Sequence, residues 1–409
     1  MQILKNIFES FGYNPIETPV LERYELFSSK YGIGQESDTM RETFKLKDQG
    51  ERDLVLRTEF TVPFSRFVAM NPQLRKPFKR YQIGDVFRDG PIKLGRYREF
   101  CQCDIDVVGL GDPAIDAEIL QLTATVFQKL GLDIEIKINN RKILNGILDF
   151  VGVPADEQLA VIISIDKLDK IGADGVGKEL EQKGIDAAMV KSVLATLVCS
   201  GGNAALIEEL REKIGNNEGL TEVERTVGLV EDGQDIVFTP CLARGLAYYT
   251  GNVFEIYLKN RTVLNSALAA GGRYDNMIGG FLQSDKPFPA LGISFGLEAI
   301  FDALNLYQKS ERKKSVVDLY IIPLGSEYLA ECFIYANKFR AAGINTDINC
   351  LADKKLKRGM EYANSYAIPW VIIMGADEIK EKKLTLKNMK TGDQEELTFA
   401  EAVKEITKK

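Results

Sequence analysis

Charged side chains of both signs share one face of a predicted β-hairpin. Alternate residues of a strand point to the same side of its sheet. On the second strand one face therefore begins basic and ends acidic, with the members Arg96, Arg98, Phe100, Gln102, Asp104 and Asp106. On the first strand the same alternation groups Arg80, Gln82, Gly84, Val86 and Arg88.

This pattern predicts a binding site for an anion. Arg88 is expected to converge with Arg96 and Arg98 across the connection at 89–95. Three guanidinium groups at one mouth of a sheet repel each other unless an anion lies among them, and phosphate matches their fork geometry well. The alternative is an exposed hairpin whose arginines pair with Asp85, Asp89 and Glu99.

The composition excludes several kinds of catalyst. The 409 residues include no histidine, which removes Ser-His, Cys-His and His-metal chemistry together with the usual general base. The six cysteines include no CxxC pair, so neither a zinc site nor a disulfide framework is expected. A net charge of -7 gives no global attraction to nucleic acid, so such a partner would need local basic patches.

The order of predicted elements divides the chain into four parts. Residues 1–148 and 232–307 carry the hairpin and further strands and helices, and a mostly helical unit at 149–231 interrupts them. The polar run 308–315 is the predicted linker, because it carries Lys and Arg without apolar periodicity. Residues 316–409 alternate strands and helices, which predicts βαβ units with a parallel sheet, then a hairpin and a final helix.

Strand-like sequence is also expected outside the hairpin. It covers residues 16–20 and returns from 236 to 257. No apolar run approaches the ~18 residues of a membrane helix, and the amphipathic N-terminus does not have the pattern of a signal peptide. These features favour a cytoplasmic protein.

Six segments in order resemble the histidyl-tRNA synthetases, a family of class II aminoacyl-tRNA synthetases. Phe87-Arg88 with residues 95–104 is similar to motif 2, residues 16–21 to motif 1, and residues 292–298 to motif 3. The other three segments are 56–63, 244–251 and 271–275. The resemblance implies an α+β catalytic core with an antiparallel sheet flanked by helices, a helical insertion and a C-terminal α/β anticodon-binding domain.

The resemblance also implies an activity and roles for single residues. Histidine is activated by ATP, which Mg²⁺ accompanies, and then passes to the 3' end of tRNA(His); no metal resides in the protein. Arg88 and Arg244 resemble the family's catalytic arginines. Arg88, Arg96, Arg98 and Phe100 resemble the residues that bind ATP in the family. Histidine binding is implied for Glu59, Thr61, Gln102, Asp106, Tyr248, Tyr249 and Arg273. Because the substrates supply the nucleophiles, the protein mainly positions them and neutralises charge.

Three positions depart from the family pattern. Ala299 stands where the family has an arginine for the γ-phosphate of ATP, Gly90 where bacterial members usually have an acid, and Ala247 where an aspartate is expected. Loss of one preorganised charged group typically costs about 10²- to 10³-fold in rate, which predicts impaired activity.

The C-terminal domain and motif 1 imply further partners. Lys354, Lys355, Lys357 and Arg358 cluster at the start of a predicted helix, where they can contact phosphates of tRNA or form a solvated helix end. Motif 1 implies a homodimer.

Two other functions fit parts of the pattern. One is a histidine-binding regulatory subunit, like that of ATP phosphoribosyltransferase, although such proteins generally lack the domain expected at 316–409. The other is a sensor of uncharged tRNA.

Overall fold

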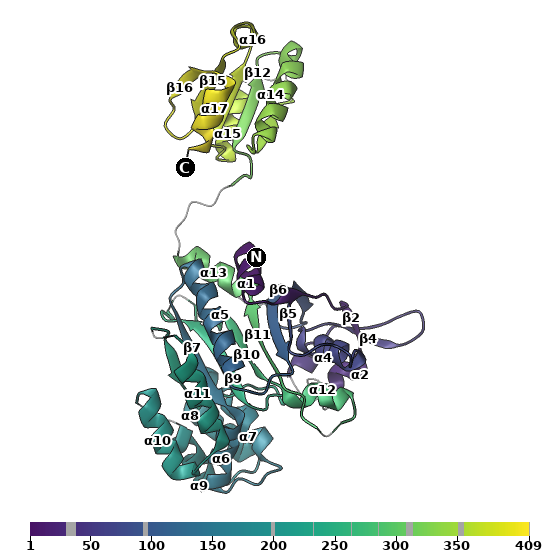
Figure 1. Cartoon of the computed structure of the whole chain (residues 1–409), viewed down its shortest axis with the longest axis vertical. Coiled ribbons are helices and arrows are strands. Elements are labelled where there is room, and N and C mark those ends of the chain that lie inside the picture. Colours follow the sequence, from purple (N-terminus) through teal and green to yellow (C-terminus); the bar gives the residue numbers. More distant parts are fainter. Residues whose placement is uncertain are drawn as a thin grey trace. The chain divides into compact units, whose positions relative to one another are not determined.

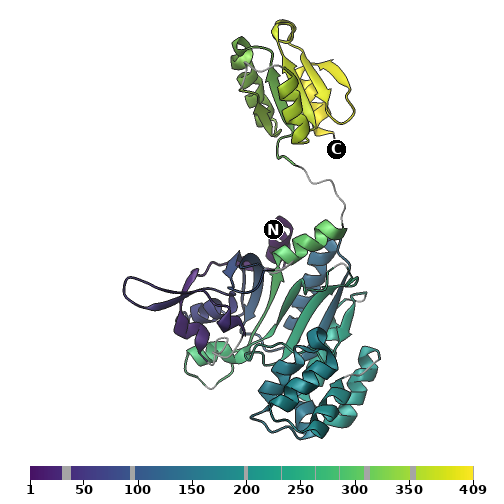
Figure 2. The same ribbon diagram turned by 180° about the vertical axis from the view of Figure 1, so that it is seen from behind.

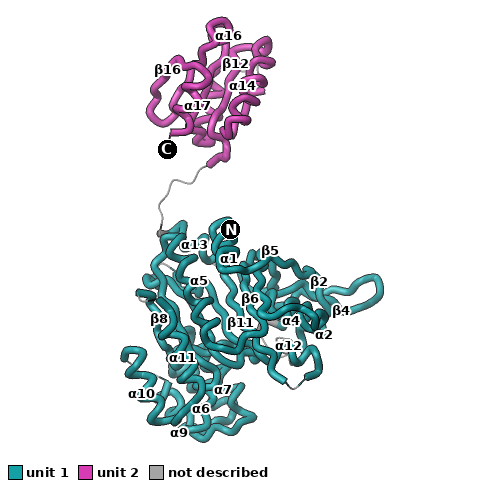
Figure 3. The backbone as a smooth tube through the Cα atoms, in the orientation of Figure 1, with its two compact units in different colours: residues 1–309 teal, residues 310–409 magenta. Residues whose placement is uncertain are grey.

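The computed structural model describes most of the chain. The described residues are 1–29, 38–92, 97–197, 201–231, 233–262, 264–284, 286–307, 314–350 and 356–408. They form two compact units, residues 1–309 and residues 310–409 (Figure 3). Most of the predicted linker, 308–315, lies outside the described residues.

An eight-stranded sheet forms the centre of the first unit (Figure 1). Its order is β1-β5-β6-β11-β10-β9-β7-β8, and all neighbours are antiparallel except the two edge pairs, β1 with β5 and β7 with β8. The strands are β1 (Asn14–Pro15), β5 (Phe78–Phe87), β6 (Glu99–Val108), β7 (Ile134–Asn140), β8 (Ile236–Phe238), β9 (Asn252–Leu258), β10 (Ala269–Arg273) and β11 (Ala290–Gly296). The expected antiparallel core sheet is confirmed.

Three helices pack on one face of this sheet. They are α1 (Gln2–Ser10), α5 (Ala114–Leu130) and α13 (Leu297–Tyr307). Cys103, Ile105 and Val107 of β6 lie in the core that these helices share with the sheet. Because strand residues alternate, Gln102, Asp104 and Asp106 face the opposite side, as their spacing predicted. The register also pairs the polar face of β5 with that of β6, setting Arg80 opposite Asp106.

A small sheet and four short helices cover part of the polar side. The sheet has the order β2-β4-β3, with β2 (Leu21–Arg23), β3 (Lys45–Lys47) and β4 (Asp53–Leu56). The helices are α2 (Tyr24–Ser28), α3 (Asp38–Arg41), α4 (Thr61–Met70) and α12 (Asp275–Phe281). The strand predicted at 16–20 is wrong, because residues 14–15 pair with β5 and regular pairing resumes only at Leu21. Thr18 instead uses its hydroxyl and carbonyl groups to bind Gln82 and Arg57.

The regular elements in the described part of residues 149–231 are all helices. Together with α6 (Arg141–Val151) they gather beside β7, β8 and β9 (Figure 2). They are α7 (Gln158–Ile165), α8 (Leu168–Gln182), α9 (Ala187–Leu197), α10 (Asn203–Ile214) and α11 (Glu218–Leu229). Their apolar side chains belong to the same core as the sheet, which is why residues 1–309 form one unit.

The second unit is an α/β domain with a five-stranded sheet. Its order is β13-β12-β14-β15-β16; β12 pairs in parallel with β13 and β14, and the last two pairs are antiparallel. The strands are β12 (Leu319–Pro323), β13 (Thr346–Ile348), β14 (Trp370–Met374), β15 (Leu384–Asn388) and β16 (Gln394–Leu397). The helices are η1 (Ser326–Tyr328), α14 (Leu329–Ala341), α15 (Leu356–Ser365), α16 (Ala376–Glu381) and α17 (Phe399–Thr407). The predicted βαβ units and terminal hairpin are confirmed.

Candidate active site

A small cavity lies on the polar face of the central sheet. We call it the inner cavity; its volume is about 80 Å³, which holds several water molecules. It is lined by Glu59, Thr61, Arg88, Gln102, Asp104, Asp106, Arg244, Leu246, Tyr248, Tyr249, Ala270, Gly271, Gly272, Tyr274, Gly292, Ile293 and Ser294. It therefore gathers two arginines, three carboxyl groups and three tyrosines from distant parts of the chain.

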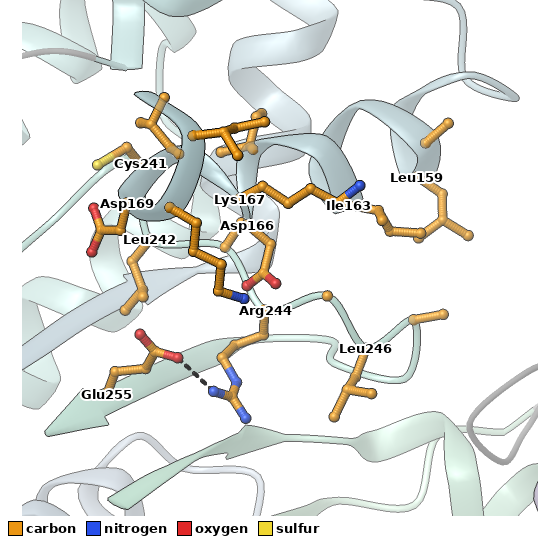
Figure 4. A pocket seen from close by; sticks show the side chains of 18 of the residues that line it. Leu159, Ile163, Asp166, Lys167, Asp169, Cys241, Leu242, Arg244, Leu246 and Glu255 are labelled. Carbon is orange, nitrogen blue, oxygen red and sulfur yellow. Dashed lines mark hydrogen bonds and ion pairs between the residues drawn. The ribbon is translucent and has the colours of Figure 1, made fainter. Parts of the chain in front are cut away.

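A much larger opening adjoins the inner cavity. We call it the outer cleft; it measures about 1420 Å³ and is lined by α7, α8, the loop before β9, and residues near α3 (Figure 4). Arg88, Arg244 and Leu246 line both spaces, so they mark the passage between them. A polar ligand in the inner cavity can thus meet a larger one in the outer cleft beside two guanidinium groups.

Asp106 of β6 is held in a buried ion pair. Its Oδ2 lies 2.5 Å from Nη2 of Arg80, and the Tyr274 hydroxyl donates to Oδ1 at 2.5 Å. Arg80 and Asp106 are both almost fully buried. Burial raises the pKa of Asp106, while the charge of Arg80 and the Tyr274 hydrogen bond oppose that shift. Buried charges are costly unless paired in this way.

Asp104 is a second carboxyl group on the same strand face. Its side chain is 3% exposed, and among the described residues its Oδ1 has no hydrogen-bond partner. Burial raises its pKa to about 8, although the Arg80 charge opposes this. The alternation along β6 had grouped Asp104 with Gln102 and Asp106, but this residue was not among the predicted ligand groups.

Glu59 and Thr61 lie where α4 begins. The two carboxylate oxygens of Glu59 accept hydrogen bonds from the backbone N–H groups of Thr61 and Val62, at 2.7 and 2.8 Å. The first N–H groups of a helix lack partners inside the helix, so Glu59 satisfies two of them. Burial raises the pKa of Glu59, and these N–H donors oppose the shift. The carboxyl group is thereby fixed at the cavity wall.

Arg88 directly follows β5 at the mouth of the hairpin. Its backbone N–H donates to the Arg98 carbonyl at 2.8 Å, and its Nε donates to the Thr58 carbonyl at 3.1 Å. The guanidinium carbon lies 5.0 Å from the centre of the Phe100 ring. These contacts direct its side chain to the passage between the two spaces.

Arg244 reaches the same passage from the loop before β9. Its Nη1 donates to Oε1 of Glu255 at 2.5 Å (Figure 4), and the Tyr257 hydroxyl donates to the other oxygen of Glu255 at 2.6 Å. Glu255 belongs to the rigid central sheet, so an arginine on a loop gains a fixed orientation.

The tyrosines of the cavity come from a loop and from the end of β10. Tyr248 and Tyr249 have ring centres 4.7 Å apart, and Tyr248 meets Tyr274 edge-on at 6.3 Å. The strand-like sequence expected from 236 to 257 forms the strands β8 and β9, but residues 239–251 between them form a loop. That loop lets neighbouring tyrosines both reach the cavity, whereas a strand would turn them to opposite faces.

Three predicted ligand residues lie away from both spaces. Arg98 is 55% exposed and binds the Gly90 carbonyl and Asp89, and Phe100 supports Arg88 from outside the cavity wall. The Arg273 guanidinium instead forms a buried pair with Asp116 and donates to the carbonyls of Leu110 and Asp112. Arg96 lies outside the described residues.

The three substituted positions have different surroundings. Ala247 is exposed and lines the outer cleft, whereas Ala299 is 7% exposed in the main core. Gly90 packs against Glu42: a Cβ atom at position 90 would lie 2.8 Å from the Glu42 carboxyl carbon. The Glu42 carboxyl group therefore occupies the space that a side chain at position 90 would fill.

The predicted basic cluster of the second unit is partly described. Lys357 and Arg358 lie in the first turn of α15; the Lys357 side chain is 84% exposed and its Nζ lies 4.0 Å from Oε1 of Glu361. Lys354 and Lys355 lie outside the described residues.

Two kinds of feature are absent from the described residues. Within them, no three Cys, Asp or Glu side chains come together as a metal site. Nor does this part of the chain contain a helix of the length and apolarity that a membrane span requires.

Comparisons with known proteins agree with this organisation. Residues 1–300 match the family model described as histidyl-tRNA synthetase, and residues 318–409 match the anticodon binding domain. Histidine–tRNA ligase 1 of Bacillus cereus is 43% identical over 400 residues, covering 95% of this chain and 91% of that protein. Histidine–tRNA ligase of Clostridium tetani is 36% identical over 424 residues, covering 98% and 92%. The solved histidyl-tRNA synthetase of Nostoc sp. PCC 7120 superposes with a TM-score of 0.82 at 28% identity, covering 99% and 93%.

Proposed function

The chain belongs to the histidyl-tRNA synthetase family, and from this premise we propose that it is a histidine–tRNA ligase. It activates histidine with ATP to histidyl-adenylate and then transfers the histidyl group to the 3' end of tRNA(His). The observation that carries this proposal is the placement of Arg88 and Arg244 where the inner cavity meets the outer cleft.

The arginines suit the first step because charge must be neutralised there. The histidine carboxylate attacks the α-phosphorus of ATP, a P–O bond forms, and the bond to the leaving pyrophosphate breaks. Both reactants are anions, so two guanidinium groups beside the point of attack lower the barrier. Arg88 contacts the α-phosphate and Arg244 spans the carboxylate and phosphate. The reaction needs no imidazole from the protein.

The inner cavity receives the amino acid. Glu59 and Thr61 accept its ammonium group, and Gln102, Asp106, Tyr248 and Tyr249 surround its ring. Arg273 is left out of this assignment, since its guanidinium group is committed to Asp116. ATP enters the outer cleft as its Mg²⁺ complex, with Arg88 on its phosphates. Phe100 supports Arg88 from outside the cavity wall, and Arg96 and Arg98, next to it in the sequence, are proposed to reach the ATP phosphates once ATP is bound.

Features of the second unit and of the N-terminal region support two further partners, tRNA(His) and a second copy of the chain. Residues 318–409 match an anticodon binding domain, which supports tRNA(His) as the partner of that unit, with Lys354, Lys355, Lys357 and Arg358 near its backbone. Exposed apolar side chains at Met1, Ile3, Val20 and Leu21 support a homodimer that buries them, and sedimentation equilibrium tests this. The protein works in the cytoplasm.

Turnover is expected to be slower than in relatives with the full motif pattern. Ala299, Gly90 and Ala247 remove three charges that the family pattern places near ATP. The Glu42 carboxyl group beside Gly90 replaces one of them in part.

Charging of a tRNA(His) transcript with labelled histidine, in the presence of ATP and Mg²⁺, tests the proposal. The expected product is acid-precipitable label that mild alkali releases, with no product when ATP or histidine is omitted. A folded protein that binds histidine but forms neither adenylate nor charged tRNA at stoichiometric concentration would overturn the ligase assignment and favour a regulatory paralogue. Salt-sensitive binding of tRNA without binding of histidine or ATP would instead favour an uncharged-tRNA sensor.

A further inference from the structure

The helical insertion, residues 149–231, reaches the loop that carries Arg244. Its contact residue is Asp166, which lies in the two-residue connection between α7 and α8. In Figure 4 the Asp166 carboxyl group lies beside the main chain at Arg244, whereas the guanidinium group points away from it toward Glu255. One acid of the insertion and one acid of the central sheet therefore flank the same arginine.

The contact between Asp166 and the loop is closest at Gly245. A Cβ atom at position 245 would lie 2.9 Å from Oδ2 of Asp166, which is too close for a real side chain. The residue that follows Arg244 thus leaves the space in which the carboxyl group lies. Burial raises the pKa of Asp166, while the charge of Arg244 and the backbone N–H group of Gly245 oppose that shift. The charged carboxylate is therefore matched to this part of the loop.

Little else holds this part of the loop. Among the described residues, no backbone–backbone hydrogen bond involves residues 243–249. The earlier part of the loop is held by the sheet, because the Asn139 amide donates to the carbonyls of Pro240 and Leu242 at 2.9 and 2.8 Å. Asp166 supplies a comparable polar anchor next to the arginine.

Asp166 itself has a fixed base. Ile162 and Ile165 of α7 are buried in the core that the insertion shares with the sheet, and the backbone N–H of Asp166 donates to the Ile162 carbonyl at 3.1 Å. The next residue, Lys167, binds both carboxylate oxygens of Glu179 on α8 at 2.8 and 2.9 Å. These contacts fix the corner between α7 and α8 from which the carboxyl group extends.

We propose that Asp166 is a positioning residue for adenylate formation, which acts through the main chain at Gly245 to hold Arg244 at the passage between the inner cavity and the outer cleft. Glu255 directs the guanidinium end of this arginine, and Asp166 fixes its backbone end. This inference rests on the proposed function, because it gives the helical insertion a part in the ATP-dependent step. Misplacement of a reacting group by about 1 Å can cost about 10²-fold in rate, so a small shift of the loop is sufficient.

The test measures formation of histidyl-adenylate by the full chain in a single turnover, with saturating ATP, Mg²⁺ and histidine. Asp166→Ala removes the carboxyl group, and Asp166→Asn keeps an oxygen that can accept from the Gly245 N–H. Asp174→Ala, which removes an exposed acid of α8, is the matched control. Calorimetric titration with histidine measures binding before the reaction, and circular dichroism verifies that each variant is folded.

The expected result is a loss of rate without a loss of binding. Asp166→Ala should slow adenylate formation about tenfold or more and change the Kd for histidine by less than about twofold, because the arginine acts in the transition state. Asp166→Asn should recover part of the rate, and Asp174→Ala should react like wild type. In an Arg244→Ala background, Asp166→Ala should lower the rate by less than about twofold further, since residues that act as a unit are not additive.

A second variant tests the same contact from the loop. Gly245→Ala keeps the carboxyl group but places a methyl group against it, and should slow adenylate formation about as much as Asp166→Ala. The double variant Asp166→Ala with Gly245→Ala should react at the rate of Asp166→Ala alone, because the methyl group then meets no carboxyl group.

Three results would overturn the inference while the proposed function stands. They are a wild-type rate in Asp166→Ala, a loss of rate that is fully additive with that of Arg244→Ala, and a loss of rate matched by an equal loss of histidine affinity. In the last two cases Asp166 supports the fold and does not act through the arginine. If the wild type forms no histidyl-adenylate, the proposed function fails together with this inference.

Discussion

Glu255 holds the Arg244 guanidinium group, with Oε1 of Glu255 2.5 Å from Nη1 of Arg244. The acid lies on β9 and the arginine on the loop that precedes it, so a strand of the central sheet fixes the direction of a loop side chain. The Tyr257 hydroxyl fixes Glu255 in turn. This chain of contacts aims one of the two cations at the passage between the inner cavity and the outer cleft.

Replacing Glu255 should therefore impair the chemistry through Arg244. We expect Glu255→Gln to lower kcat for adenylate formation about tenfold or more while changing the KM for histidine less, because a misdirected group costs transition-state stabilisation. Single-turnover kinetics with saturating ATP measure this. Glu135→Gln, which alters another ion pair of the same sheet, with Arg261 at 3.4 Å, is the matched control and should leave kcat unchanged. Equal rates for wild type and Glu255→Gln would show that Arg244 needs no such support.

Arg273 should prove structural rather than substrate-binding. Its Nε lies 3.1 and 3.0 Å from the oxygens of Asp116, which is fully buried. Removing the cation leaves an uncompensated buried charge, so Arg273→Met should lower the free energy of unfolding by about 3–5 kcal/mol. Arg261→Met breaks the partly exposed pairs with Glu135 and Asp169 and should cost about 1 kcal/mol. Urea denaturation followed by circular dichroism compares the two, and a stable Arg273→Met protein that has lost only histidine affinity would contradict the assignment.

A side chain at Gly90 should displace the Glu42 carboxyl group. A Cβ atom there would lie 2.8 Å from the Glu42 carboxyl group, whereas at Gly111 it would meet Pro289 at an ordinary 3.6 Å. We expect Gly90→Ala to raise the KM for ATP several-fold because the Glu42 carboxyl group must move from its place beside the hairpin, and Gly111→Ala to behave like wild type. Steady-state pyrophosphate exchange measures both. Wild-type kinetics in Gly90→Ala would mean that Glu42 moves without consequence.

The basic start of α15 should contribute to tRNA affinity. Lys357 and Arg358 lie on this helix, and the Lys357 side chain is 84% exposed. The double change Lys357→Ala with Arg358→Ala should weaken binding of tRNA(His) and reduce the slope of log affinity against log salt by about 1.4, since each phosphate contact to unpaired strands contributes about 0.7. Filter binding at several salt concentrations measures this. Lys382→Ala with Lys383→Ala, also exposed in the second unit, is the control, and equal slopes in both double variants would exclude a phosphate contact at α15.

Local patterns predicted most of the fold. The period-2 alternation of residues 79–108 predicted which side chains of β5 and β6 face the polar side, because one face of the sheet packs against helices and the other does not. The alternation of strands and helices after residue 316 predicted the parallel part of the second sheet. Periodicity failed at residues 16–20 and 239–251, where side-chain and tertiary contacts replace strand pairing.

The candidate site was predictable only in part. Sequence motifs indicated Arg88, Arg244 and Gln102 as ligand groups, and all three line the inner cavity. The partners of Arg273 and Asp106 were not predictable, since Asp116 and Arg80 reach them through long-range packing. Without those partners, Asp104 and Asp106 look equivalent in the sequence, and only the structure shows that Asp106 pairs with Arg80 and Tyr274.

Histidine-dependent exchange of labelled pyrophosphate into ATP tests most directly whether Arg88 and Arg244 join an amino-acid cavity to an ATP site. The wild-type protein should catalyse this exchange with histidine and with no other standard amino acid, and Arg88→Ala and Arg244→Ala should each lower the rate about 10²- to 10³-fold. Exchange that does not depend on histidine, or that proceeds at the wild-type rate in both arginine variants, would contradict the account.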